Sequence, residues 1–351
     1  MSRFFNTKYS TLEPYTPGEQ PKDMQYIKLN TNESPFAPSK KAQKMAARAA
    51  KKLELYPDPE CSELKVLGRK TFSVDESEII FTNGSDEVLQ FAFMAYGENG
   101  AVFPNISYGF YSVFAELHNV EYKELPLKSD FTINVEDYIG VNKAVFIANP
   151  NAPTGIALTL SEIEEILKSN KDNVVVIDEA YVDFGTESAV GLINKYDNLL
   201  VVGTFSKSRS MAGARLGYGI ASKEIIADLN TIRYSTNPYN INRMTMAAGI
   251  GTMKDGKYTE MCCKTVIENR VYLSAELKKL GFTLTDSKAN FVFAKHETIS
   301  GETLYKKLKA KGVLVRHFNK PLISDYLRIT IGSKKQLNAL LKAINEILEE
   351  C

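Results

Sequence analysis

The sequence is poor in the residues that build metal centres and disulfide frameworks. Among its 351 residues it has no tryptophan, three histidines and four cysteines. The histidines lie far apart and offer no cluster of metal ligands. Two cysteines are adjacent, but neither metal-ligand spacing nor a disulfide framework is found among the four, which are Cys61, Cys262, Cys263 and Cys351. We therefore expect no metal site, and we interpret the cysteines as reduced thiols.

A strong net charge and long apolar runs are also missing. Lys and Arg total 43 and Asp and Glu total 42, which gives a formal net charge of +1. The basic residues are scattered, which argues against binding to nucleic acid or to acidic membranes. No stretch approaches the ~20 apolar residues of a membrane span. We expect a cytoplasmic protein whose substrates are small molecules.

Short apolar runs alternate with helix-like segments between about residues 79 and 221. The runs cover residues 79–81, 101–103, 144–148, 174–177, 199–202 and 217–221. The segments between them include expected helices over 87–96 and 161–168, the second opened by Ser161 with Glu164 in capping-box spacing. This alternation predicts an α/β fold with a mostly parallel sheet sandwiched by helices.

The pattern changes after Pro238. A long helix is expected over 257–279, followed by short strands around 282–284, 290–294 and 313–315. An amphipathic helix is expected from Lys334 onward. These segments predict a second, smaller α+β domain.

A lysine follows the run at 199–202. Lys207 lies among hydroxyls and glycines, with Arg215 eight residues later. A deprotonated lysine amine forms a Schiff base with an aldehyde, and hydroxyls together with a guanidinium can hold a phosphate. The segment therefore suits a lysine-bound phosphorylated aldehyde; the alternative is a solvated loop whose Lys and Arg face water.

Two carboxylates and a phenol follow the run at 174–177, in the order Asp178, Glu179, Ala180 and Tyr181. Side chains at the carboxyl end of such a strand lie where open α/β sheets bind ligands. Asp178 could keep a pyridine nitrogen protonated, and Tyr181 could donate to a ring oxygen. The alternatives are an acidic helix cap or the metal-binding aspartate of a nucleotide hydrolase. The chain has no Gly-x-x-x-x-Gly-Lys-Ser/Thr loop, which counts against the hydrolase.

A rigid turn follows the run at 144–148. Residues 149–155 read Asn-Pro-Asn-Ala-Pro-Thr-Gly, and the two prolines and the glycine restrict the backbone. The turn could present an asparagine amide to a ligand above the sheet. A purely structural turn is an equal alternative.

Taken in chain order, the turn at 149–155, then the carboxylates and phenol at 178–181, then Lys207 with Arg215, the three motifs resemble those of the fold type I aminotransferases, which carry pyridoxal 5′-phosphate. The resemblance covers nearly the whole chain, and it is narrower to the histidinol-phosphate aminotransferases. Further segments that carry the narrower resemblance are 12–18, 28–35, 56–58, 83–87, 315–318 and 327–332. It implies a seven-stranded-type sheet in a large cofactor-binding domain over 46–237. The small domain would be discontinuous, formed by residues 1–45 and 238–351.

The same resemblance implies a homodimer with shared active sites. The expected reaction transfers the amino group of L-histidinol phosphate to 2-oxoglutarate in histidine biosynthesis. The alternatives are an aromatic amino-acid aminotransferase and an enzyme similar to threonine-phosphate decarboxylase. Specificity among them rests on a few pocket side chains.

The resemblance assigns catalytic roles to three residues. Lys207 would bind the cofactor aldehyde and, once displaced by substrate, move a proton between the substrate carbon and the cofactor. Asp178 would pair with the pyridinium nitrogen, and Tyr181 would donate to the phenolic oxygen.

The resemblance also implies the remaining cofactor contacts. Tyr108 would stack on the ring. The phosphate would bind to backbone amides, hydroxyls and a guanidinium, supplied by Gly84, Ser85, Asp86, Thr204, Ser206 and Arg215. Tyr56 would reach the phosphate of the neighbouring subunit. The family usually has asparagine where this chain has Ala152, so either Asn151 replaces it at the phenolic oxygen, as we expect, or Tyr181 serves alone.

For the substrate, the resemblance points to Arg328 as a carboxylate clamp. Arg316, twelve residues earlier, would be a second cation that allows one pocket to hold both a carboxylate and a phosphate. Tyr15 is expected to act as a lid residue, and Asn290 is expected to line the same pocket.

Overall fold

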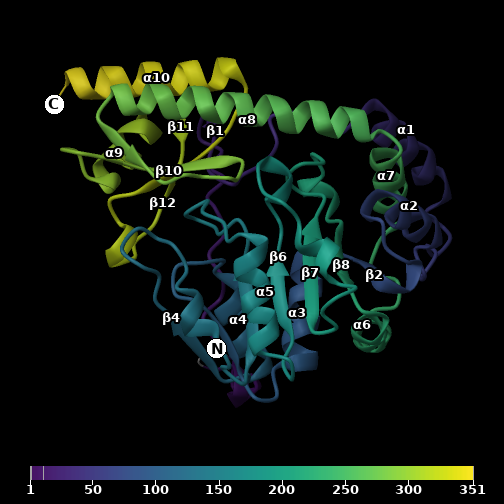
Figure 1. Cartoon of the computed structure of the whole chain (residues 1–351). Helices are drawn as coiled ribbons and strands as arrows, with labels where there is room; N and C mark the ends of the chain where they lie inside the picture. Colours follow the sequence, from purple (N-terminus) through teal and green to yellow (C-terminus); the bar gives the residue numbers. More distant parts are fainter. Residues whose placement is uncertain (1, 11, 351) are drawn as a thin grey trace.

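The structure is a computed structural model that describes residues 2–10 and 12–350. Its centre is a seven-stranded sheet in the order β2-β8-β7-β6-β5-β3-β4 (Figure 1). β8 is antiparallel to both of its neighbours, and the other adjacent strands are parallel. The strands are Ile79–Thr82 (β2), Ala101–Pro104 (β3), Tyr122–Leu125 (β4), Ala144–Ala148 (β5), Val175–Asp178 (β6), Leu199–Thr204 (β7) and Gly217–Ala221 (β8). The predicted mostly parallel sheet is confirmed.

Helices cover both faces of this sheet, as strands buried on both faces require. Along β5, Val145 and Ile147 belong to one hydrophobic core, and Phe146 belongs to the other. The first core includes side chains of α2 and α5, and the second includes side chains of α3, α4 and α6. These helices are Ser62–Phe72 (α2), Ser85–Tyr96 (α3), Phe110–His118 (α4), Leu160–Ser169 (α5) and Lys223–Thr236 (α6).

A second, antiparallel sheet has the strand order β12-β13-β10-β9. Its strands are Phe282–Leu284 (β9), Phe291–His296 (β10), Arg316–His317 (β12) and Leu327–Thr330 (β13). The helices α8 and α10 lie side by side over it (Figure 1). They and the shorter α9 contribute to the core of this sheet, and their bounds are Gly256–Lys279 (α8), Gly301–Ala310 (α9) and Lys334–Glu349 (α10).

The N-terminal segment contacts both parts of the molecule. β1 (Ile27–Lys28) pairs in parallel with β11 (Val313–Leu314), next to the second sheet. α1 (Lys40–Ala49) packs against α7 (Arg243–Met253), and α7 contributes Met246 and Ile250 to a core of the large sheet. The domain boundaries expected at 45/46 and 237/238 stay a prediction. Short 3-10 helices span Thr7–Tyr9, Ala50–Lys52, Glu76–Glu78, Val135–Tyr138, Val182–Phe184, Ala189–Leu192, Ala212–Ala214 and Pro321–Ile323.

The start of α5 corrects one sequence expectation. The capping box is formed by Thr159 and Glu162, not by Ser161 and Glu164. Both pairs have the required spacing, so the spacing alone does not choose between them. In the fold the chain is extended at Thr159, with ψ 161, and Glu164 is paired with Lys195 instead. Glu164 is therefore engaged with Lys195 and not with the start of the helix.

The structure also bears on the expectations about cysteines, metal sites and membrane spans. Cys61, Cys262 and Cys263 are free thiols, and Cys351 lies outside the described residues. Burial raises the pKa of Cys61 to about 11 and that of Cys263 to about 12, which disfavours the reactive thiolate. Within residues 2–10 and 12–350, no three His, Cys, Asp or Glu side chains gather as a metal-ligand group. No helix in these ranges is long and apolar enough to cross a membrane.

Candidate active site

A cavity lies at the carboxyl ends of β5, β6 and β7, where an open α/β sheet binds its ligands. The predicted motifs all reach it because each of them directly follows one of these strands. Of the predicted residues, the cavity brings together Ser85, Asp86, Tyr108, Asp178, Tyr181, Thr204, Ser206, Lys207 and Arg215.

Lys207 lies in the turn after β7. The turn is held by the amide of Ser206, which donates to Thr204 Oγ1 (3.1 Å). Lys207 Nζ donates to the carbonyl of Thr31 (3.4 Å) and lies 5.8 Å from the ring centre of Tyr181. Among the described residues no carboxylate forms an ion pair with Lys207. Its amine is therefore available to a carbonyl compound in the cavity.

Asp178 ends β6 and is buried, with 5% of its surface exposed. Desolvation raises its pKa to about 7, although hydrogen bonds from Ala180 N (3.2 Å) and Tyr111 Oη (3.2 Å) oppose this change. A buried carboxyl with a raised pKa at a cavity wall suits a cationic partner, such as a pyridinium nitrogen. The sequence analysis missed Tyr111, which lies in the first turn of α4, three residues after Tyr108.

Tyr181 lines the cavity with its ring edge-on to Phe291, the ring centres 5.2 Å apart. Its hydroxyl accepts a hydrogen bond from Asn32 Nδ2 (3.0 Å). Asn32 belongs to the segment 28–35 that carried the family resemblance, but no sequence pattern indicated this contact.

The start of α3 forms an anion site. Gly84 precedes the helix with φ +79, and no side chain caps the helix. The Ser206 hydroxyl is buried without a described hydrogen-bond partner. Arg215 Nη2 lies 2.7 Å from Asp86 Oδ2, and Tyr108 donates to Asp86 Oδ1 (2.7 Å). Free helix amides, an unpaired hydroxyl and a guanidinium suit a phosphate, so these residues fit pyridoxal 5′-phosphate.

The turn at 149–155 corrects the expectation for Asn151. Its amide donates to Ile106 O (3.0 Å) and Thr154 Oγ1 (3.0 Å), and its oxygen accepts from Ser107 Oγ (2.8 Å). Ala152, not Asn151, lines the cavity. Asn151 would have to leave three hydrogen bonds to reach a ligand, so the contact of Tyr181 alone with the phenolic oxygen stays as the prediction for this position.

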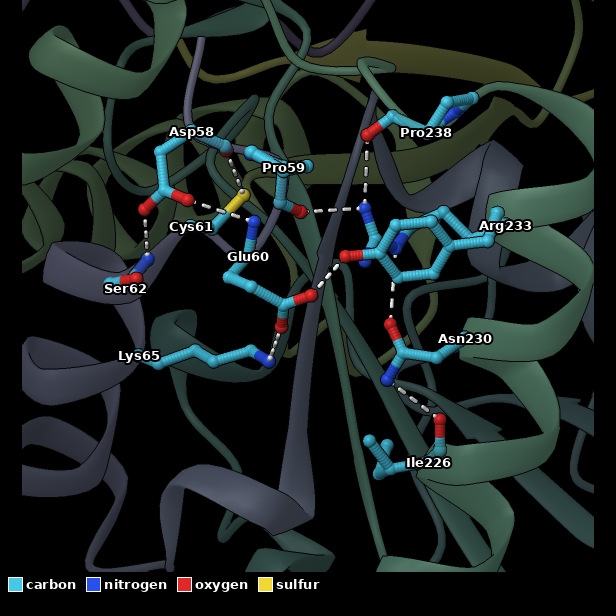
Figure 2. A network of polar contacts seen from close by, with 11 residues as sticks. Asp58, Pro59, Glu60, Cys61, Ser62, Lys65, Ile226, Asn230, Arg233 and Pro238 are labelled. Carbon is cyan, nitrogen blue, oxygen red and sulfur yellow. Dashed lines mark hydrogen bonds and ion pairs between the residues drawn. The ribbon is translucent and has the colours of Figure 1, made fainter.

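Tyr56 is not among the residues that line the cavity. It is 77% exposed and stacks on Tyr239, with ring centres 4.5 Å apart. The segment that follows it is held by the buried Arg233, which donates to Pro59 O (2.8 Å) and Pro238 O (3.3 Å) (Figure 2). The chain therefore presents Tyr56 outward on a fixed support.

A second cavity adjoins the first and shares Tyr108, Tyr181 and Lys207 with it. The predicted residues Tyr15, Arg316 and Arg328 line it, as do Phe318 and Lys320, which the sequence analysis missed. Phe318 ends the segment 315–318 that carried the family resemblance, but no role was predicted for it, and Lys320 lies two residues beyond that segment.

Arg328 has an N–H group without a hydrogen-bond partner among the described residues. Its Nη2 donates to Asn30 O (3.1 Å), and its buried Nε has no described partner. Desolvation lowers the pKa of Arg328, because no carboxylate offsets the burial of its charge. In the part of the chain that the structure describes, the hydrogen bonds of Arg316 are long, to Pro17 O (3.4 Å) and Thr16 O (3.5 Å), and its guanidinium lies 5.7 Å from the ring centre of Phe318. Both arginines therefore have free N–H groups that can donate hydrogen bonds to an anionic ligand.

Of the two other predicted substrate residues, Tyr15 lines the second cavity and Asn290 does not. Tyr15 lines the second cavity and stacks on Phe110, with ring centres 4.3 Å apart. Asn290 is buried behind the cavity wall, where its Nδ2 donates to Asn32 O (2.9 Å). Asn290 does not line either cavity. The expectation that it lines the substrate pocket is therefore wrong, and its side chain holds Asn32 instead.

The chain belongs to the family of class I and II aminotransferases, whose family model matches residues 24–344. It is 49% identical to the histidinol-phosphate aminotransferase of Brachyspira hyodysenteriae over 99% of this chain and 100% of that protein. It is 47% identical to the histidinol-phosphate aminotransferase of Marinomonas sp. over 99% of this chain and 100% of that protein.

Solved structures agree with this assignment. The histidinol-phosphate aminotransferase of Clostridium acetobutylicum superposes with a TM-score of 0.86 at 27% identity, over 92% of this chain and 99% of that chain. The L-threonine-O-3-phosphate decarboxylase of Porphyromonas gingivalis shares the fold, with a TM-score of 0.82 at 23% identity over 92% and 99%. The predicted family, the fold type I architecture and the pyridoxal-phosphate-dependent aminotransferase class are confirmed.

Proposed function

We propose that this chain transfers the amino group of L-histidinol phosphate to 2-oxoglutarate, which yields imidazole acetol phosphate and L-glutamate in histidine biosynthesis. The names of the full-length relatives support this reaction. The carrying observation is the charge of the second cavity: Arg316, Lys320 and Arg328 line it, and its described lining contains no Asp or Glu. One substrate brings a phosphate and the other two carboxylates, and guanidinium groups pair with either anion.

The first cavity would hold the cofactor. Asp178 would face the pyridinium nitrogen, Tyr181 the phenolic oxygen, and the anion site at the start of α3 the phosphate. Ser206 and Arg215 would complete that anion site. When bound, the cofactor supplies an electron sink for the bond that breaks at the substrate carbon.

Lys207 would perform the proton transfer. It would hold the cofactor through its amine and, after the substrate amine has taken its place, would move the proton from the substrate carbon to the cofactor. The absence of a carboxylate partner among the described residues supports this role, because an ion pair would favour the protonated amine.

The second cavity would orient the substrate. Arg328, with its unpaired Nε, would accept the carboxylate or phosphate, and Arg316 would add a second cation. The stack of Tyr15 on Phe110 gives the N-terminal segment a fixed position at the cavity. Tyr15 would then exclude water from the reacting atoms.

The proposed functional unit is a homodimer with shared active sites. The 77% exposure of Tyr56, whose carbonyl accepts a hydrogen bond from Arg243 Nη2, favours a contact with another copy of the chain. In that dimer Tyr56 would donate to the phosphate held by the neighbouring subunit. A cytoplasmic location stays a prediction.

The substrate is tested by mixing the yellow holoenzyme with candidate amino donors and following loss of the absorbance of the lysine-bound cofactor. Fast loss with histidinol phosphate and slow loss with phenylalanine and tyrosine are expected. The matched control is Arg328→Lys, which keeps a charge but removes the bidentate donor and should slow the return reaction with 2-oxoglutarate. Faster reaction with the aromatic amino acids, or release of carbon dioxide from threonine phosphate, would contradict the proposal.

A further inference from the structure

Asn32 lies at the junction between the N-terminal segment and the second sheet. It is 1% exposed and has a left-handed backbone, with φ +56. Three hydrogen bonds tie it to the side of the second sheet. Its N–H donates to Thr330 Oγ1 (2.9 Å), its Oδ1 accepts from Thr330 Oγ1 (3.0 Å), and its carbonyl accepts from Asn290 Nδ2 (2.9 Å).

These bonds determine which way the Asn32 amide points. Thr330 Oγ1 already accepts a hydrogen from the backbone of Asn32, so its own hydrogen is directed to Oδ1. The amide oxygen therefore faces Thr330, and Nδ2 faces Tyr181. An amide nitrogen can only donate, which makes the Tyr181 oxygen the acceptor at 3.0 Å.

The donor from Asn32 leaves the phenol hydrogen of Tyr181 free. The Asn32 bond is the one hydrogen bond that the described residues give to this hydroxyl. The charged and titratable groups that face Tyr181 are Lys207, Arg328, Asp178 and Tyr111. None of them takes the phenol hydrogen in the described structure, so that hydrogen can be donated into the first cavity.

We propose that Asn32 is a positioning residue that directs the phenol hydrogen of Tyr181 to the phenolic oxygen of the cofactor. This inference rests on the proposed function, which puts that oxygen next to Tyr181. It also links the two parts of the molecule. Thr330 ends β13 of the second sheet, whereas Tyr181 follows β6 of the large sheet. The position of the second sheet thereby controls the donor at the cofactor.

The test is a pH titration of the absorbance of the lysine-bound cofactor in the holoenzyme without substrate. A hydrogen bond donated to the phenolic oxygen favours the form that has lost its proton, so it lowers the pH midpoint. Asn32→Gly removes the amide while tolerating φ +56. We expect it to raise the midpoint by about one pH unit, the equivalent of one hydrogen bond.

Two further variants separate positioning from a general structural effect. In a Tyr181→Phe background, Asn32→Gly should leave the midpoint unchanged, because there is no phenol to orient. The matched control is Asn119→Gly, which makes the same change at φ +57 at the C-cap of α4 and should not move the midpoint. The dissociation constant of pyridoxal phosphate and the melting temperature are measured for every variant.

Three outcomes overturn the proposal. The first is a folded, cofactor-loaded Asn32→Gly protein with an unchanged midpoint, and the second is an equal shift with and without Tyr181. The third is a wild-type protein that takes up no pyridoxal phosphate, which overturns the proposed function as well. Failure of histidinol phosphate as the donor contradicts only the proposed substrate, because the titration uses none.

Discussion

At the scale of single residues, two adjacent buried carboxyls at the end of β6 have different roles because their side chains point in different directions. Burial raises the pKa of Asp178 to about 7 and that of Glu179 to about 8. Asp178 faces the cavity. Glu179 points away and accepts hydrogen bonds from Ser188 Oγ (2.6 Å) and Ala189 N (2.6 Å), which hold the following turn. One carboxyl is thus available for a ligand, and its neighbour stabilises the fold.

The raised pKa of Asp178 predicts how the stability of the cofactor-free protein depends on pH. The folded state holds this proton up to about pH 7, whereas the unfolded state releases it near the ordinary value of 3.8. Unfolding therefore releases a proton between these values, and the free energy of unfolding falls as the pH rises through this window. Asp178→Asn stays neutral, so its stability relative to wild type should rise by about 2 kcal/mol from pH 5 to pH 8.

Urea unfolding of both proteins at several pH values measures this difference. Glu179 titrates in both and cancels from the comparison. A difference that is constant between pH 5 and pH 8 would show that burial does not hold the proton on Asp178.

Lys207 predicts a covalent outcome. Lys207→Ala should fold but should not fix the cofactor, because the cavity would then have no amine beside the aldehyde. Borohydride reduction followed by peptide mass spectrometry measures the attachment. The wild type should carry the cofactor on the peptide that contains Lys207, and cofactor found on a different peptide would refute the assignment.

At the scale of elements, the anion site depends on close contact between the start of α3 and the segment before β8. A Cβ on Gly84 would lie 2.5 Å from Arg215 Nη2, and a Cβ on Gly217 would lie 2.3 Å from the carbonyl carbon of Gly84. The missing side chains allow Arg215 to reach Asp86. Glycine is therefore needed here for the approach, and at Gly84 also for φ +79.

Gly84→Ala should weaken cofactor binding because the new methyl group displaces the guanidinium of Arg215. Loss of one charge-assisted hydrogen bond corresponds to an increase of about tenfold or more in the dissociation constant. Fluorescence titration of the cofactor-free protein with pyridoxal phosphate measures it. The control is Gly213→Ala in the same loop, where a Cβ meets no atom within 4 Å. Equal dissociation constants for the two variants would contradict this account of the anion site.

At the scale of the whole molecule, the active site draws on both sheets. Lys207, Asp178 and Tyr181 follow strands of the large sheet, whereas Arg316 and Arg328 lie on strands of the second sheet. A small hydrophobic cluster joins the two parts, with Ile106 of the large sheet region packed with Phe293 and Ile323. The relative position of the two sheets therefore sets the distance between cofactor and substrate groups.

The proposed dimer predicts recovery of activity in mixed subunits. Tyr56→Ala alone should reduce activity strongly, because a hydrogen bond to a charged group contributes about 1.5–3 kcal/mol. Lys207→Ala alone should be inactive. A hybrid dimer of the two variants contains one site with native Lys207 and native Tyr56 from opposite chains, so mixing should regenerate activity.

Activity is measured after the two variants, each with its own affinity tag, have exchanged subunits and the hybrid has been purified. Each variant dimer carried through the same steps is the control. Activity of verified hybrids that does not exceed the sum of the parents would show that Tyr56 does not serve the other subunit.

The sequence by itself determined the parts of this protein that depend on local pattern. The alternation of apolar runs and helices predicted six of the seven strands of the large sheet, because a buried strand is a short apolar run. It missed β4 (Tyr122–Leu125), an edge strand whose residues are mostly polar and only partly buried. Lys207, Asp178 and Tyr181 could be located at the ligand-binding edge because each directly follows such a run. The segment 83–87 likewise marked the anion site.

Only the tertiary structure decided which side chains meet across the two sheets. Asn32 lies 149 residues from Tyr181 and 298 residues from Thr330 along the chain. Tyr111 reaches Asp178 across the sheet face, and Asn151 is withdrawn into its own turn. No periodicity or motif encodes these contacts. They arise from how side chains pack within the large-sheet part and between it and the second sheet, and hydrogen bonds between buried polar groups depend on that packing to within a fraction of an ångström.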